Sequence, residues 1–341
     1  MAVDIATSVA EAGFEIYGLR VRLSGDWPEV VESVRLDFAW FEVPLVGGNG
    51  FDVHVAVEHR PPDFDAFGSI AASFVTPRNV VYQHDGRTIV DYFGRAVSIL
   101  DRASGSLTVQ GEHRALVEEA VYLYMLSRIG EHLEAHGLVR VHGLSLAGAH
   151  GAVTVMLPSG GGKSTLALRA LRSDGVKLLS EDSAVLDRHG RLHPFPLRIG
   201  INETQAEMLP PGHVRRIDRI EGHTKLAFEV HGFADRVESE PQPLRHIVIG
   251  RRSLGTEPRL ERLPRRAAAG TLLREVVVGV GIYQGMEFLL QRGLRDVAGK
   301  SGLFTGRAVA CGAALAHADV WRLTLGREHA RNWELLRTLL D

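Results

Sequence analysis

Apolar and polar residues alternate along much of the first third of the chain. Residues 51–57 place apolar side chains at every second position, which is typical of a strand with one buried face. Asp85-Gly86 separates two apolar runs and favours a two-residue hairpin turn. We therefore predict a β-rich N-terminal domain, of α+β character, over residues 1–112, which would supply contacts to a substrate or partner.

The hydrophobic period then changes to one of three and four residues, which predicts a helix over residues 113–136. A continuous apolar strand follows at 152–157, and after it come a glycine-rich loop, a helix and another strand. Helical segments are also predicted at about 267–296 and 328–340. This order of elements predicts an α/β fold with a catalytic domain over residues 113–341.

The loop Pro158–Thr165 contains three successive glycines followed by Lys163 and Ser164. The backbone N–H groups of such a loop, and of the helix after it, point at phosphate oxygens. Lys163 can reach the β- and γ-phosphates of ATP, and the Ser164 hydroxyl can ligate Mg²⁺. The predicted nucleotide-binding residues are Ser159, Gly160, Gly161, Gly162, Lys163, Ser164 and Thr165, with ATP and Mg²⁺ as cofactors. The usual pattern has glycine six residues before the lysine, where this chain has Leu157.

Two adjacent carboxylates end the strand that follows the loop helix. Glu181 and Asp182 lie 18 and 19 residues after Lys163, and a carboxylate at this place in P-loop proteins commonly holds Mg²⁺. Two acids allow one to bind the metal while the other acts as general base on an acceptor hydroxyl. An NTPase that activates water could use the same pair, and a solvated strand end is the third interpretation.

Four segments in this order resemble the HPr kinase/phosphorylase family and its HPr-kinase-like relatives, which include kinases found with lasso-peptide clusters. They are Val141-His142-Gly143, the loop Ser159–Thr165, Leu179-Ser180-Glu181-Asp182, and Pro194–Gly200. His142 lies 21 residues before Lys163. Generic P-loop GTPases and ABC ATPases have no functional reason to place a histidine at this position. The resemblance covers about residues 136–250.

The resemblance implies a PEP-carboxykinase-like P-loop domain that transfers the γ-phosphate of ATP to a serine hydroxyl. It assigns Asp182 as a metal ligand together with Ser164, Glu181 as the base and His142 as an active-site partner. Glu181 stands where the family usually has aspartate, and no match to the segment that contacts HPr is evident. The expected acceptor is therefore a peptide, a protein or a small molecule with a hydroxyl group. The family precedent is a homo-oligomer.

Two further basic residues are candidates for neutralising charge on the transferring phosphoryl group. Arg198 belongs to the last of the four segments, and Lys225 is one of only four lysines in the sequence. A solvated surface position is the alternative for each of them.

Composition limits the possible partners. Lys and Arg number 39 against 41 Asp and Glu, so the chain has no global basic field for nucleic acid or an anionic membrane. Arginines concentrate over residues 245–274 without interleaved aromatics, which favours a solvated face. A single cysteine, Cys311, excludes a disulfide framework. No signal peptide or apolar run of about 18 residues is recognisable, so we expect a cytoplasmic protein.

The leading hypothesis from the sequence is thus a kinase with an alcohol group as acceptor. A nucleotide-binding regulatory or scaffold protein with little phosphotransfer is the alternative, motivated by Leu157 and Glu181. A simple ATPase is the third hypothesis.

Overall fold

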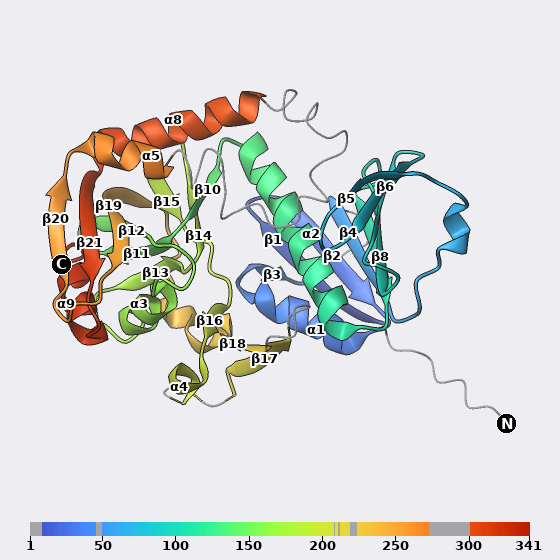
Figure 1. The fold of residues 1–341 in the computed structure, drawn as a ribbon, viewed down its shortest axis with the longest axis horizontal. Helices are drawn as coiled ribbons and strands as arrows, with labels where there is room; N and C mark the ends of the chain where they lie inside the picture. The colour runs from blue at the N-terminus through green and yellow to red at the C-terminus, as the bar shows by residue number, and fades with distance from the viewer. Residues whose placement is uncertain (1–8, 46–49, 208, 211, 219–223, 273–300) are drawn as a thin grey trace. The chain divides into compact units, whose positions relative to one another are not determined.

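The computed structural model describes residues 9–45, 50–207, 209–210, 212–218, 224–272 and 301–341, with side chains from residue 305 in the last range. The protein is a mixed α/β structure with two large sheets (Figure 1). The chain forms two compact units. Among the described residues, the first comprises residues 9–129 and the segment 215–227, and the second comprises the remainder. The first unit runs past residue 112 to Ile129, and the predicted division of the chain into two domains at residue 112 stays a prediction.

The first unit is built on a nine-stranded sheet in the order β3-β1-β2-β4-β9-β8-β7-β6-β5. The strands are β1 (Ala10–Ile16), β2 (Leu19–Gly25), β3 (Glu42–Val43), β4 (Val53–Glu58), β5 (Ala72–Val75), β6 (Val80–His84), β7 (Arg87–Asp91), β8 (Ala96–Asp101) and β9 (Ser106–Gly111). Asp85 and Gly86, at φ 47° and 76°, form the turn between β6 and β7, because a type I′ hairpin turn needs two positive φ angles. The predicted hairpin is confirmed, and the sheet agrees with the predicted β-rich region.

Helices complete the first unit. They are α1 (Pro28–Asp37), the short 3₁₀ helices η1 (Ala39–Phe41) and η2 (Asp65–Phe67), and most of α2 (Arg114–Ala135). The predicted helix at 113–136 is therefore confirmed to within a residue at each end. Phe14 of β1 meets Phe38 edge to face at 5.9 Å between ring centroids, which anchors the end of α1 on the sheet. Arg215 of β17 (Val214–Asp218) donates to Ser33 and Asp37 of α1, which ties a late segment of the chain to this unit.

The second unit contains a sheet in the order β10-β14-β15-β19-β12-β11-β13, to which β21 and β20 are added beside β19. Its strands are β10 (Val139–His142), β11 (Leu144–Gly148), β12 (Gly151–Met156), β13 (Lys177–Ser180), β14 (Ser183–Leu186), β15 (Arg191–His193), β19 (Gln242–Arg252), β20 (Arg259–Leu263) and β21 (Asp319–Leu325). β12, β19 and β21 run parallel to one another. Parallel strands are covered on both faces, which explains why every residue of β12 is buried.

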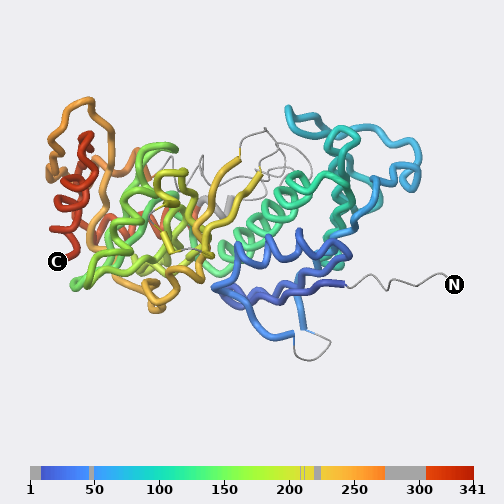
Figure 2. Tube along the Cα trace, turned by 90° about the horizontal axis from the view of Figure 1, so that it is seen from below, coloured from blue at the N-terminus to red at the C-terminus, as the bar shows by residue number. Residues whose placement is uncertain are grey.

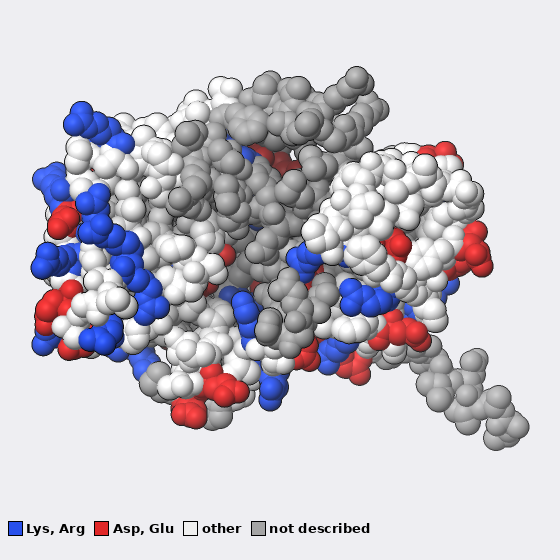
Figure 3. All heavy atoms as spheres, in the orientation of Figure 1, with Lys and Arg blue, Asp and Glu red and all other residues white. Residues whose placement is uncertain are grey.

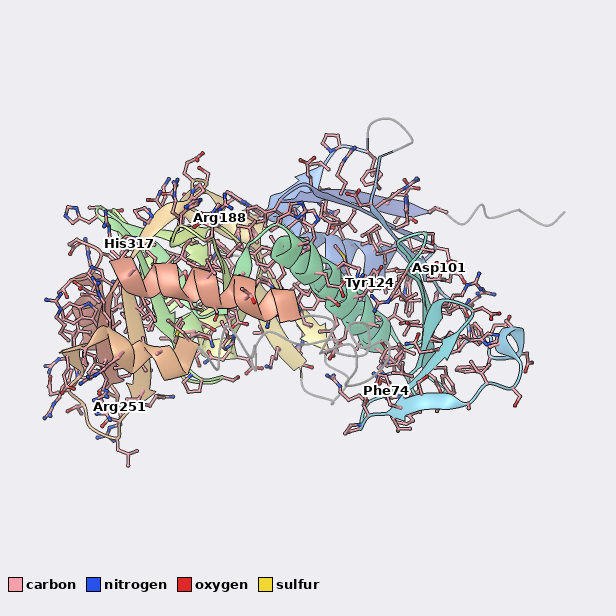
Figure 4. The ribbon with its side chains drawn as sticks, turned by 90° about the horizontal axis from the view of Figure 1, so that it is seen from above. Phe74, Asp101, Tyr124, Arg188, Arg251 and His317 are labelled. Atoms are coloured by element: carbon pink, nitrogen blue, oxygen red, sulfur yellow. The ribbon has the colours of Figure 1, made fainter. Side chains whose placement is uncertain are left out.

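The helices of this unit are α3 (Lys163–Ala170), α4 (Glu203–Ala206), α5 (Ala269–Leu272), α8 (Ser301–His317) and α9 (His329–Arg337), with 3₁₀ turns η3 (Val230–Gly232), η4 (Ala234–Arg236) and η5 (Arg265–Ala268). α8 crosses one face of the sheet, where Ala310, Cys311 and Ala314 enter the core (Figure 4). α9 packs against α3, so segments far apart in sequence lie side by side (Figure 2). α9 lies within the predicted 328–340 helix, whereas residues 273–296 of the other predicted helix lie outside the described residues.

Basic side chains gather along the β20–β21 edge of the second unit (Figure 3). Several of them are paired with acids on the same edge, such as Arg262 with Asp319 at 2.7 Å and Arg322 with Glu261 at 3.8 Å. This pairing lowers the net field of the edge and agrees with a solvated face. Arg274, the last arginine of this run, lies outside the described residues.

In the part of the chain that the structure describes, we find no helix with both the length and the apolar character that a membrane span requires.

Candidate functional site

The glycine-rich loop connects the end of β12 to the start of α3. β12 is parallel to its neighbour β19, and ligands of open α/β sheets bind beyond the carboxyl ends of such strands. Gly162 caps α3 at φ 109°, and Gly160 has φ 70°, both in the region that favours glycine. Pro158, Ser159 and Gly160 are exposed, so a ligand can reach the tip of the loop.

The first turn of α3 supplies hydrogen-bond donors for an anion. The helix begins at Lys163, and its first backbone bond runs from the N–H of Leu166 to the carbonyl of Gly162. The preceding N–H groups, those of Lys163, Ser164 and Thr165, have no carbonyl partner within the helix and point out of its end. Together with the helix dipole they favour a phosphate group at this position.

Leu157, which stands in place of the usual first glycine, is part of the core. Its side chain is buried and lies against Gly250 of β19, where an added Cβ would come within 2.4 Å of a Leu157 methyl carbon. Gly250 therefore provides the space that the leucine fills. The departure from the usual loop pattern is accommodated by packing and leaves the exposed part of the loop intact.

This packing gives a stability prediction. Gly250→Ala is expected to lower the free energy of unfolding by about 1–3 kcal/mol, because it overpacks the contact with Leu157. In a Leu157→Ala background, Gly250→Ala should lower the free energy of unfolding by less. Urea unfolding of wild type, the two single variants and the double variant measures this coupling. Gly200→Ala is the matched control, since an added Cβ there meets nothing within 4 Å. Additive effects of the Gly250 and Leu157 changes would contradict the packing argument.

Lys163 is at the centre of the site. Its Nζ donates to the carbonyl oxygen of Leu157 at 2.9 Å and lies 3.0 Å from Nε2 of His142. It also lies 3.4 Å from Oδ1 of Asp182. The side chain is only 7% exposed, so its charge is held near the loop and screened little by solvent.

A bend between two strands brings His142 to the loop. β10 ends at His142 and β11 begins at Leu144, which pairs with Val155 near the end of β12. The N–H of Gly143 donates to the backbone carbonyl of Asp182 at 3.0 Å, so the bend is fixed to the connection between β13 and β14. The spacing of His142 and Lys163 in the sequence thus corresponds to a real contact.

The contacts of His142 define its tautomer in the Lys163–His142–Asp182 cluster. Nε2 faces the ammonium group of Lys163 and acts as an acceptor, so the proton of the neutral ring is assigned to Nδ1. Nδ1 lies 3.4 Å from Oδ1 of Asp182, whose side chain is 52% exposed. The imidazole, the ammonium group of Lys163 and the carboxylate of Asp182 are therefore in mutual contact, and the carboxylate is open to solvent.

Glu181 has a different set of neighbours. The hydroxyl of Ser164 donates to its Oε1 at 2.7 Å. Burial raises the pKa of Glu181 to about 7, and the charge of Asp182 adds to the rise, while Ser164 and Lys163 oppose it. The carboxylate oxygens of Glu181 and the hydroxyl oxygen of Ser164 are ligands of the kind that Mg²⁺ prefers. Among the described residues no group of three His, Cys, Asp or Glu could hold a metal alone, and Mg²⁺ commonly completes its shell with substrate phosphates.

The structure therefore brings together His142, Lys163, Ser164, Glu181 and Asp182. Arg198 is half-buried immediately before β16 (Ile199–Ile201) and takes no part in the contacts above. Lys225 is exposed on β18 (Thr224–Phe228) and belongs to the first unit. The proposed charge-neutralising roles of Arg198 and Lys225 stay predictions.

One contact of the loop was not expected from the sequence. Nε2 of Gln205 donates to Oγ1 of Thr165 at 3.1 Å. Gln205 belongs to α4, whose start is fixed by reciprocal side-chain bonds between Asn202 and Gln205. The Asn-x-x-Gln spacing is a recognisable helix-start signal, but it carries no information on the position of α4 beside the loop.

Protein-family models and curated proteins were both compared with the chain, and neither comparison gives a match.

Proposed function

We propose that this protein is an ATP- and Mg²⁺-dependent kinase of HPr-kinase-like type, which transfers the γ-phosphate to a hydroxyl of a peptide, a protein or a small molecule. The observation that carries the proposal is the position of Lys163, which contacts the phosphate loop at Leu157 and also His142 and Asp182. A phosphate-binding cation and a candidate base thus lie within one cluster. The β12–loop–α3 arrangement supports a PEP-carboxykinase-like P-loop domain.

The phosphate-binding part of the proposal rests on the loop. The N–H groups of the loop and of the first turn of α3 bind the β- and γ-phosphates, and Lys163 neutralises charge between them. Mg²⁺, when bound, withdraws charge from the phosphate oxygens and fixes their geometry. Ser164 and Glu181 would hold it, because their oxygens are paired at 2.7 Å in a partly buried position.

The base in this proposal is Asp182, positioned by His142, which reverses the roles assigned from the resemblance. Asp182 accepts the proton of the acceptor hydroxyl while that oxygen bonds to the γ-phosphorus. The bond from the γ-phosphorus to the β–γ bridging oxygen breaks, and ADP leaves with its electron pair. The exposed Asp182 carboxylate leaves room for an acceptor, whereas Glu181 is occupied by Ser164.

The accommodation of Leu157 by Gly250 weakens the case for a regulatory protein without phosphotransfer, because it removes one of the two departures that motivated that hypothesis.

Direct transfer of the γ-phosphate distinguishes the kinase from the regulatory protein. Wild type, Lys163→Ala and Lys177→Ala are incubated with γ-labelled ATP, Mg²⁺ and extract of the source organism. Lys177 is an exposed lysine at the start of β13 and serves as the control. Label that appears with wild type and Lys177→Ala but not with Lys163→Ala is expected, whereas ATP binding without transferred label favours the regulatory protein.

The pKa of Glu181 gives a pH prediction in the absence of metal and nucleotide. The folded-state pKa of about 7 exceeds the ordinary glutamate pKa of 4.5, so folding favours the protonated carboxyl. The stabilisation is complete below about pH 4.5 and is lost as pH rises through about 7. In EDTA, Glu181→Gln should match wild type in stability at about pH 4 and exceed it at about pH 8 by about 1–3 kcal/mol. Urea unfolding at both pH values measures this, with exposed Glu240→Gln as control. An equal gain at both pH values would contradict it.

A further inference from the structure

A pocket of about 390 Å³ lies beside the phosphate loop, between α3, α4 and the start of α9. All of the residues that line it belong to the second unit. Its volume falls within the range typical of small-molecule sites, roughly 300–1,000 Å³. Apart from Thr165, the residues that line the pocket belong neither to the phosphate loop nor to the Lys163–His142–Asp182 cluster.

The pocket begins where a bound triphosphate would end. Thr165, Leu168 and Arg169 line it from α3, at spacings of three and four residues, so they share one face of the helix. Thr165 is two residues after Lys163, and Arg169 lies about 6 Å further along the helix axis. Arg172, in the turn after α3, extends the same side. A ligand whose phosphates occupy the end of α3 can therefore extend its remaining part along this face.

The chemistry of the walls suits a flat ring. Trp333 of α9 and Leu168 are both buried and supply apolar walls. Arg169 and Arg172 carry planar cations, which stack on aromatic rings. Asn202, from the start of α4, offers an amide that can pair with the edge of a ring. The described residues that line the pocket include no carboxylate.

The pocket is also joined to the loop. Gln205 lines it and donates to the hydroxyl of Thr165 at 3.1 Å, so the two sites share a wall. From the position, the volume and the wall chemistry, we infer that this pocket holds the nucleoside end of the phosphate donor, with Trp333 and the planar guanidinium groups against the nucleobase and the sugar. The inference rests on the proposed function, and it identifies a binding site for the nucleobase, for which the sequence shows no motif.

The test compares two ligands that share phosphates but not a nucleoside. Calorimetry measures binding of ATP and of inorganic tripolyphosphate, each with Mg²⁺, to the full chain. The proteins are wild type, Arg169→Ala, Arg172→Ala and Lys163→Ala, with Arg188→Ala as the control for loss of an arginine. Arg188 is exposed between β14 and β15 (Figure 4), and it is not among the residues that line the pocket. Arg172 is exposed as well, so its replacement is expected to leave the fold intact.

We expect Arg169→Ala and Arg172→Ala to weaken ATP binding by about tenfold each while tripolyphosphate binding changes less than about twofold. Lys163→Ala should weaken both ligands, and Arg188→Ala neither. The inference is overturned if the pocket variants leave ATP affinity unchanged or weaken both ligands equally. If Lys163→Ala still weakens both ligands in that case, only the nucleoside pocket fails. If wild type binds neither ligand, the proposed function fails together with it.

Discussion

Lys163→Ala is expected to lower the rate of MgATP-dependent phosphotransfer by about 10²–10³-fold or more. The buried ammonium group lies against the loop carbonyl of Leu157 and the carboxylate of Asp182, where solvent screens it little. Charge that develops on the transferring phosphoryl group has no equivalent partner once the ammonium group is removed. Steady-state kcat/KM for the labelled acceptor, with Lys177→Ala as control, measures the effect.

Lys163→Arg is not expected to restore activity. A guanidinium group is larger than an ammonium group and has a fixed planar geometry, while Lys163 is 7% exposed and in contact with three neighbours. Retention of more than half of the wild-type rate by either variant would show that the loop lysine does not bind the transferring phosphate.

Asp182→Asn is expected to lower phosphotransfer by about 10²–10⁴-fold with ATP affinity changed little, because it removes the proton acceptor beside His142 while keeping the shape of the side chain. Glu181→Gln should instead raise the Mg²⁺ concentration needed for half-maximal activity, because the glutamate is paired with Ser164. Rates measured across a Mg²⁺ titration separate the two effects.

The fully exposed Asp174 provides the matched control for these variants, since Asp174→Asn removes a carboxylate outside the cluster. The opposite pattern is equally informative. If Glu181→Gln loses turnover at every Mg²⁺ concentration and Asp182→Asn changes only the Mg²⁺ requirement, then Glu181 is the base and Asp182 the metal ligand, as the resemblance implied.

Glu181 and Asp182 have different contacts, and this difference shows why part of the site could not be predicted from the sequence. Two neighbouring residues at the end of a strand point in different directions, and which one faces Ser164 depends on how the β13–β14 connection turns. That turn is fixed by a hydrogen bond from the N–H of Gly143, which lies in the bend between β10 and β11, about 40 residues earlier in the chain. Spacing along the sequence predicted that the two acids approach the loop, but not their separate contacts.

The sequence by itself determined the features that depend on near neighbours. The Asp85-Gly86 hairpin, the helix over Arg114–Ala135 and the exposed glycine-rich loop before Lys163 follow from local backbone preferences and hydrophobic period, which a linear pattern records. Only the tertiary structure decided the contacts of Leu157 with Gly250 and of Gln205 with Thr165. It also decided that residues 215–218 and 224–227 belong to the first unit. These depend on strand order and on the packing of distant segments, and no local pattern encodes which of many apolar or polar partners a side chain meets.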